Sequence, residues 1–119
     1  MDSKTQGSSL KVLVIEDSEL QSMILLAMLR RCNCETARAE NGKEAVDLYL
    51  EGKTFDIILC DKQMPIMNGP EAIVKIRSMG ATEVKIVGLS ADSDATEEFI
   101  SDGADMFVAK PMKLEVSRI

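Results

Sequence analysis

The sequence predicts an α/β fold, a doubly wound parallel sheet of five strands with helices on both faces. Two observations support this prediction. Short apolar stretches without polar alternation recur along the chain, which is typical of strands buried on both faces. Longer segments with apolar residues at helical spacing separate these stretches. Because β–α–β crossovers are right-handed, this alternation favours one sheet that is covered on both sides.

The first strand and the first helix have clear signals. Lys11 to Ile15 (KVLVI) is an apolar, β-branched run that predicts a buried strand. A helix should begin at Ser18, because Ser18 and Gln21 have the spacing of a capping box. It should end near Arg30 and Arg31, whose charges suit the negative end of a helix dipole. The apolar residues at helical spacing in between, which we expect to pack, are Leu20, Met23, Ile24, Ala27 and Met28.

The rest of the chain continues the alternation. Further strands are expected at 34–38, 55–60, 84–89 and 105–109. Further helices are expected from Asn41, from Gly69-Pro70 and from Asp94 to Ile100, with a short last helix at 113–119. Proline suits the first turn of a helix because its missing amide proton has no partner there. The natural strand order is the flavodoxin-like order 2-1-3-4-5, in which ligands bind beyond the carboxyl ends of the strands.

Length and composition exclude several kinds of catalysis and of binding partner. The 119 residues suffice for one domain, with a polar tail at residues 1–9 and the folded domain at residues 10–119. The absence of histidine excludes Ser-His-Asp catalysis and a phosphohistidine on this chain. The net charge of −6 argues against DNA or an anionic membrane as the main partner. The three cysteines are interpreted as reduced thiols of an intracellular protein, and the chain has no apolar run long enough to span a membrane.

Polar and charged side chains follow four of the predicted strands. They are Glu16-Asp17, Asp61, Ser90-Ala91 and Lys110-Pro111. Because the carboxyl ends of parallel strands meet at one edge of a sheet, these groups should converge. Three converging carboxylates repel one another, and a divalent cation removes that conflict. Oxygen ligands alone point to Mg²⁺, with Mn²⁺ as a substitute.

This constellation is typical of phosphoryl transfer onto a carboxylate. Asp61 is the best nucleophile because it stands alone after a central strand, whereas the adjacent Glu16 and Asp17 suit metal binding. Lys110 would supply a positive charge to the phosphoryl group, and Ser90 a hydroxyl donor.

The chain resembles the receiver domain of response regulators in two-component phosphorelays, over roughly residues 10–114. The motifs are Glu16-Asp17, the loop from Asp61-Lys62-Gln63-Met64-Pro65 to Asn68-Gly69, Leu89-Ser90-Ala91, and Phe107-Val108-Ala109-Lys110-Pro111. The resemblance implies Asp61 as the phosphoacceptor. It implies a Mg²⁺ site of Asp17, Asp61 and the backbone carbonyl of Gln63, with Glu16 acting mostly through water. Ser90 and Phe107 would be switch residues, Lys110 would pair with the phosphoryl group, and the Lys110-Pro111 peptide would be cis.

Three positions depart from the common pattern of that family. Glu16 replaces the more usual Asp, Ser90 stands where Thr is commoner, and Phe107 stands where Tyr is common. The short last helix puts in doubt an output through the face formed by the fourth helix, fifth strand and fifth helix.

The resemblance extends to plant stand-alone receivers, including type-C response regulators, and hence to cytokinin signalling. Because the chain has no histidine, its phosphodonor must act in trans, and we expect a histidine phosphotransfer protein or a histidine kinase in that role. We also expect a monomer, located in the cytoplasm or also in the nucleus. Two alternatives stay open: a phosphohistidine phosphatase that acts as a phosphate sink, and a pseudo-receiver without chemistry. Met23 and Met28 are interpreted as packing residues, with a soft docking surface for a partner's helices as the alternative.

Overall fold

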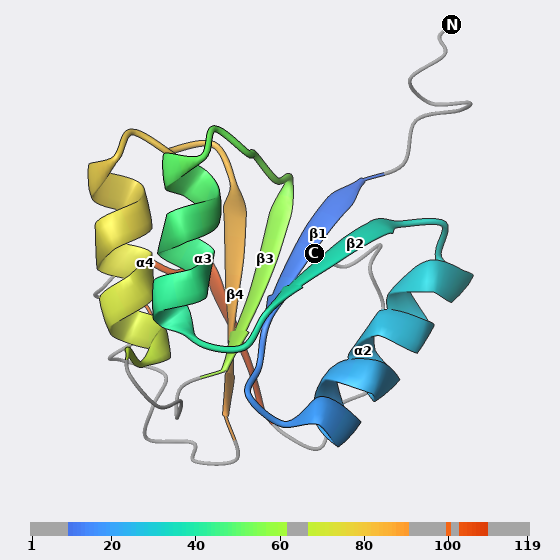
Figure 1. Ribbon diagram of the computed structural model, residues 1–119. Coiled ribbons are helices and arrows are strands. Elements are labelled where there is room, and N and C mark those ends of the chain that lie inside the picture. Colours follow the sequence, from blue (N-terminus) through green and yellow to red (C-terminus); the bar gives the residue numbers. More distant parts are fainter. Residues whose placement is uncertain (1–9, 62–66, 91–99, 101–102, 110–119) are drawn as a thin grey trace, which may run out of the picture.

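The computed structural model describes residues 10–61, 67–90, 100 and 103–109 (Figure 1). Its elements are β1 (Lys11–Ile15), α2 (Glu19–Arg31), β2 (Glu35–Ala39), α3 (Gly42–Leu50), β3 (Ile57–Asp61), α4 (Gly69–Ser78), β4 (Lys85–Ser90) and β5 (Met106–Ala109). The strands form one parallel sheet in the order β2-β1-β3-β4-β5, which confirms the predicted order and class. The helices expected at 94–100 and 113–119 fall almost entirely outside the described residues.

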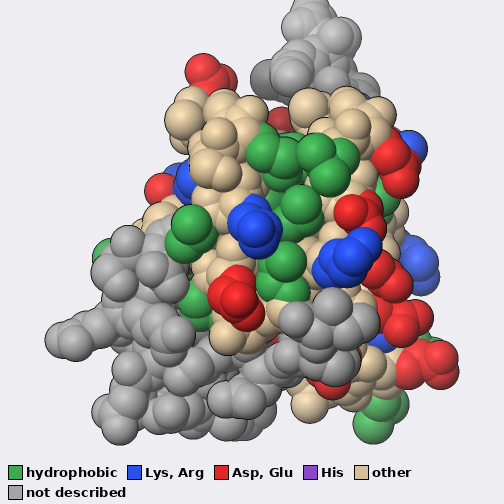
Figure 2. All heavy atoms as spheres, turned by 60° about the vertical axis from the view of Figure 1, so that its left-hand side comes forward, with side chains coloured by type: hydrophobic (Ala, Val, Ile, Leu, Met, Phe, Trp, Pro, Cys, Tyr) green, Lys and Arg blue, Asp and Glu red, His purple; other side chains and the backbone are tan. Residues whose placement is uncertain are grey.

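The sheet divides the core into two layers. On one face Leu13, Ile15 and Ile58 pack with residues of α3 and α4, and on the other Val12 and Val14 pack with residues of α2. This alternation follows from the two-residue period of a strand. Figure 2 brings the α4 side forward and shows a strip of hydrophobic side chains with charged side chains on both sides.

Local sequence signals predicted the helix starts, through caps at Ser18 and Asn41 and through proline at Gly69-Pro70. Ser18, Asn41 and Asn68 are the N-caps of α2, α3 and α4, and each side chain accepts a hydrogen bond from the backbone three residues later. Asn68 and Glu71 form a complete capping box at α4, just ahead of Pro70 in the first turn. Each of these helices follows a strand that ends at the carboxyl edge of the sheet, so the capped N-termini lie at that edge.

The predicted buried face of α2 was wrong. Its buried residues are Ser22, Leu25 and Leu29, whereas Leu20, Met23 and Ile24 are 68%, 61% and 54% exposed. Both sets recur at helical spacing, so periodicity alone does not select between the two stripes. The buried stripe tolerates Ser22 because its hydroxyl donates to the carbonyl of Glu19 at 3.0 Å.

Within the described part of the chain, no helix is long and apolar enough to cross a membrane.

Candidate functional site

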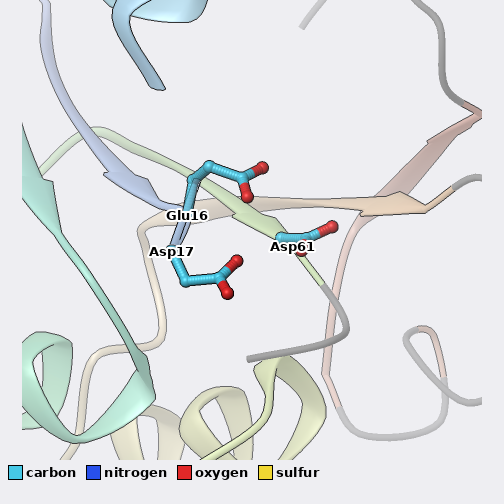
Figure 3. A group of neighbouring side chains, drawn as sticks. All are labelled: Glu16, Asp17 and Asp61. Carbon is cyan, nitrogen blue, oxygen red and sulfur yellow. The ribbon is translucent and has the colours of Figure 1, made fainter. Parts of the chain in front are cut away.

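Three carboxylates meet at the carboxyl edge of the two central strands. Glu16 and Asp17 directly follow β1, and Asp61 is the last residue of β3. One oxygen from each side chain lies within 4.8 Å of the others, and Figure 3 shows the three carboxylates around a common space. Glu16 and Asp61 are 1% and 7% exposed, whereas Asp17 is exposed. The cluster is therefore buried at Glu16 and Asp61 and exposed to solvent at Asp17.

The turn after β1 is held by backbone contacts. The Glu16 amide donates to the carbonyl of Ala39 at 3.0 Å, which continues the β1–β2 ladder by one step. The Glu16 carboxylate accepts from the amide of Ser18 at 3.2 Å, so it also contributes to the start of α2. Arg38 donates to the carbonyl of Glu16 at 3.0 Å and to that of Asp17 at 3.3 Å. These bonds orient both acidic residues before any ligand binds.

Sequence reasoning missed Arg38. It lies in the weakest predicted strand, and no local motif connects it with a turn more than twenty residues earlier. Only the pairing of β2 with β1, in which Val14 lies opposite Arg38, brings the guanidinium beside this turn. Arg38 places a positive charge behind the acidic pair while binding carbonyl oxygens rather than the carboxylates.

The backbone of Asp61 lies directly against Gly69, the first residue of α4. A Cβ on Gly69 would lie 2.2 Å from the carbonyl oxygen of Asp61 and 3.0 Å from the Sγ atom of Cys60. Such distances leave no room for a side chain, so α4 approaches β3 this closely only with glycine at that position. The main chain of Asp61 is fixed by this contact.

Cys60 points away from the carboxylates, into the core on the α3 and α4 face. Its thiol donates to the carbonyl of Asp61 at 3.5 Å. Burial raises the pKa of the Cys60 thiol far above its ordinary value, and the charges of Asp61 and Glu16 raise it further. Cys60 is therefore a protonated packing residue beneath the site.

The other predicted site residues are placed less completely. Ser90 ends β4, one residue beyond Leu89, which is paired with Asp61, so its backbone lies at the same edge. Phe107 lies on β5, partly buried against the core on the α3 and α4 face. Gln63, Lys110 and Pro111 lie outside the described residues, as does the predicted cis peptide.

The donor set of the cluster suits a hard divalent cation. All three groups offer carboxylate oxygens, and no thiol takes part. Mg²⁺ prefers such oxygen ligands and commonly keeps waters in its remaining positions, which the exposed Asp17 side permits. The arrangement can therefore hold a cation beside an aspartate nucleophile.

Comparisons with known proteins agree with this geometry. Residues 12–117 match the family model of the response regulator receiver domain. The chain is 57% identical over 113 residues to the two-component response regulator ORR42 of Oryza sativa subsp. japonica, covering 95% of this chain and 85% of that protein. This plant relative supports the resemblance to plant response regulators.

Two solved structures share the fold. One is the receiver domain of the sensor histidine kinase PA1611 from Pseudomonas aeruginosa, described with magnesium in its active-site cleft. Its TM-score is 0.80 and its sequence identity 28%, and the match covers 89% of this chain and 88% of that one. The other is the receiver domain of Ssk1 from Saccharomyces cerevisiae in complex with the histidine phosphotransfer protein Ypd1. Its TM-score is 0.80 and its identity 28%, covering 88% of this chain and 81% of that one.

Proposed function

This chain belongs to the response regulator receiver family, and we propose that it accepts a phosphoryl group on Asp61 from a phosphohistidine donor. The observation that carries the proposal is the carboxylate cluster, in which Asp61 ends a central strand beside Glu16 and Asp17. A carboxylate oxygen of Asp61 attacks phosphorus, and the bond between phosphorus and the donor nitrogen breaks. The products are an aspartyl phosphate on this chain and a neutral histidine on the donor, whose released nitrogen keeps the bonding electron pair and takes up a proton from solvent.

The acidic residues would hold Mg²⁺, or Mn²⁺ in its place. Asp17 and Asp61 would bind the ion directly with the carbonyl of Gln63, and Glu16 would act mostly through water. When bound, the cation offsets the crowded negative charge and stabilises the charge on the phosphoryl oxygens. Lys110 and Ser90 would contact the same oxygens, and Phe107 would respond to the modified site.

The exposed stripe of α2 is the proposed docking surface for the donor. Leu20, Met23 and Ile24 form an exposed apolar stripe, defined here as the α2 stripe. α2 begins two residues after Asp17, so its first turn adjoins the cluster. A receiver of the same fold is known in complex with a histidine phosphotransfer protein. Flexible methionine and aliphatic side chains suit contact with the helices of such a partner.

Phosphoryl uptake by the whole chain tests the proposed acceptor. Wild type incubated with Mg²⁺ and a small phosphodonor such as acetyl phosphate should gain one phosphoryl group by mass spectrometry. Asp61→Asn should gain none, whereas Asp47→Asn, which changes an exposed aspartate on α3, should behave as wild type. Unchanged labelling of Asp61→Asn would sink the assignment.

The docking surface is tested with two donors. Met23→Asp should slow transfer from a phosphorylated histidine phosphotransfer protein by about 10-fold or more, since a charge then faces an apolar contact. It should leave uptake from acetyl phosphate unchanged. Leu50→Asp is the matched control, because Leu50 is 69% exposed on α3. Equal slowing by both variants would remove α2 from the proposal.

The lifetime of the aspartyl phosphate, measured in the same samples, separates a persistent switch from a phosphate sink.

A further inference from the structure

Arg77 binds together three segments at the amino edge of the sheet. It lies in the last turn of α4, and its side chain is 20% exposed. Its guanidinium donates to the carbonyls of Ala81 and Val84 at 3.0 and 2.8 Å. It also donates to the carbonyl of Gly103 at 2.9 Å and to the carboxylate of Asp105 at 2.9 Å. One side chain thus ties the end of α4 to the segments that lead into β4 and β5.

Asp105 extends the ladder between β4 and β5. Its backbone amide donates to the carbonyl of Ile86 at 2.8 Å. Its carboxylate accepts from the amide of the same Ile86, also at 2.8 Å. The side chain therefore takes the place that a strand carbonyl would occupy, one residue before β5 begins. The pair Asp105–Ile86 sets which residue of β5 lies opposite which residue of β4.

Gly103 lets the arginine lie flat against this turn. Its φ of +116° is a conformation that side-chain-bearing residues rarely adopt. A Cβ there would lie 3.2 Å from the Cγ atom of Arg77 and 3.3 Å from the Cγ2 atom of Ile73. The turn at Gly103 thus packs closely against α4 and against the aliphatic part of the Arg77 side chain.

The register of β5 matters because this strand is short and lies at the edge of the sheet. It has four residues, Met106–Ala109, and pairs only with β4 in the described sheet. In the observed register Phe107 lies opposite Gly88, and a slip by one residue would turn its side chain to the other face. Four ladder positions define a register weakly, so an anchor before the strand has a large effect.

We propose that Arg77 and Asp105 are positioning residues that hold β5 in register on β4 and thereby keep Phe107 on the α3 and α4 face of the sheet. The effect on Phe107 as a switch rests on the proposed function, whereas the effect on register does not. Asp105 supplies the acceptor that aligns the strands. Arg77 keeps that acceptor in place by holding both Asp105 and the carbonyl of Gly103.

Hydrogen exchange on the unphosphorylated protein tests whether this anchor holds β5 on β4. Asp105→Ala should raise the exchange rates of the β5 amides roughly 10-fold or more while β1 and β3 stay near wild type, because the opening is local. Asp105→Asn should stay close to wild type, since its amide oxygen still accepts from Ile86. Arg77→Lys should be intermediate, because one ammonium group cannot reach all four acceptors. Lys43→Gln, which removes the exposed pair with Asp47 on α3, is the matched control and should change nothing.

Two results would overturn the proposal. If Asp105→Asn exchanged as fast as Asp105→Ala, charge rather than the ladder contact would matter. If all strands accelerated equally in Asp105→Ala, the residue would serve global stability alone.

Phosphoryl uptake provides the second readout. Asp105→Ala should take up the group more slowly than wild type under conditions where both stay folded, and Asp105→Asn should restore the rate. Equal rates in Asp105→Ala and wild type would overturn the link from register to site. Absence of uptake by wild type would instead refute the proposed function, and the exchange result would still test the register.

Discussion

At the carboxyl edge of the sheet three carboxylates lie within 4.8 Å of one another, whereas at the amino edge Asp56 and Asp105 each accept a strand amide. Asp56 accepts from Lys11 at 2.8 Å and Asp105 from Ile86 at 2.8 Å. Carboxylate side chains thus have two different roles in this molecule. Where a carboxylate pairs with donors it aligns strands, and where carboxylates crowd together they form a site for a cation and a reaction.

Removal of divalent cations should affect the carboxyl edge and leave the amino edge unchanged. EDTA should reduce phosphoryl uptake from acetyl phosphate by about 100-fold or more, because the cation stabilises the charge of the transferring group. Exchange of the β5 amides should not change, since the amino edge uses only groups of the chain. Mass spectrometry measures both. Strong labelling in EDTA would contradict the metal role of the carboxyl edge.

Gly69→Ala tests how tightly the carboxyl edge is packed. The added methyl group collides with the carbonyl of Asp61, so the variant should lose about 1–3 kcal/mol of unfolding free energy and take up phosphate more slowly. Urea unfolding and the uptake assay measure these effects. Gly52→Ala is the control: Gly52 has a φ of +92° and no atom within 4 Å of its missing Cβ. It should lose about 1 kcal/mol through its backbone alone, with normal uptake.

Neutralising one carboxylate at the carboxyl edge and one at the amino edge should change the unfolding free energy in opposite directions. Asp17→Asn relieves repulsion in the cluster, so without Mg²⁺ it should raise the unfolding free energy by about 0.5 kcal/mol. It should also weaken the stabilisation that added Mg²⁺ produces. Asp105→Asn loses its attraction to Arg77 and should lower the unfolding free energy by a similar amount. Urea titrations with and without Mg²⁺ decide this. A loss of stability in metal-free Asp17→Asn would contradict the crowding interpretation.

Tyr49 lies near the end of α3, on the side of the amino edge, and should give the smallest effect. Its ring packs edge-on against Phe55 with centroids 5.9 Å apart, and its buried hydroxyl makes no hydrogen bond within the described residues. Burial raises the pKa of Tyr49, and the nearby Phe55 backbone and the Arg77 charge offset only part of that rise. The unfolded chain therefore releases this proton first, so stability should fall as the pH passes upward through about 10.

The chain has a single tyrosine, so phenolate absorbance reports Tyr49 alone. Its midpoint should lie above that of the urea-unfolded chain. Tyr49→Phe should change the unfolding free energy at pH 7 by less than about 0.5 kcal/mol and should remove part of the alkaline loss. A midpoint equal to that of the unfolded chain would show that the hydroxyl is solvated.

Local signals in the sequence were sufficient for much of the fold. The caps at Ser18 and Asn41 and the proline in the first turn of α4 are local signals, so they predicted the helix starts. The cap at Asn68 is seen only in the structure. Buried apolar runs predicted β1, β3, β4 and β5 to within about two residues, and the strand alternation predicted the weaker β2. Right-handed crossovers then left one natural strand order. Because parallel strands end at one edge, the convergence of Glu16, Asp17 and Asp61 also followed from the sequence.

Tertiary structure decided what depends on contacts between distant segments. Two stripes of α2 have helical spacing, and only docking on the sheet selected Leu25 and Leu29 for burial and left Met23 exposed. Arg38 reached the turn after β1 only through strand pairing. Arg77 reached Gly103 and Asp105 across 26 and 28 residues of sequence. The sequence by itself thus determined the elements and the acidic site, because those signals are local, while the tertiary structure chose the exposed faces and the positioning contacts.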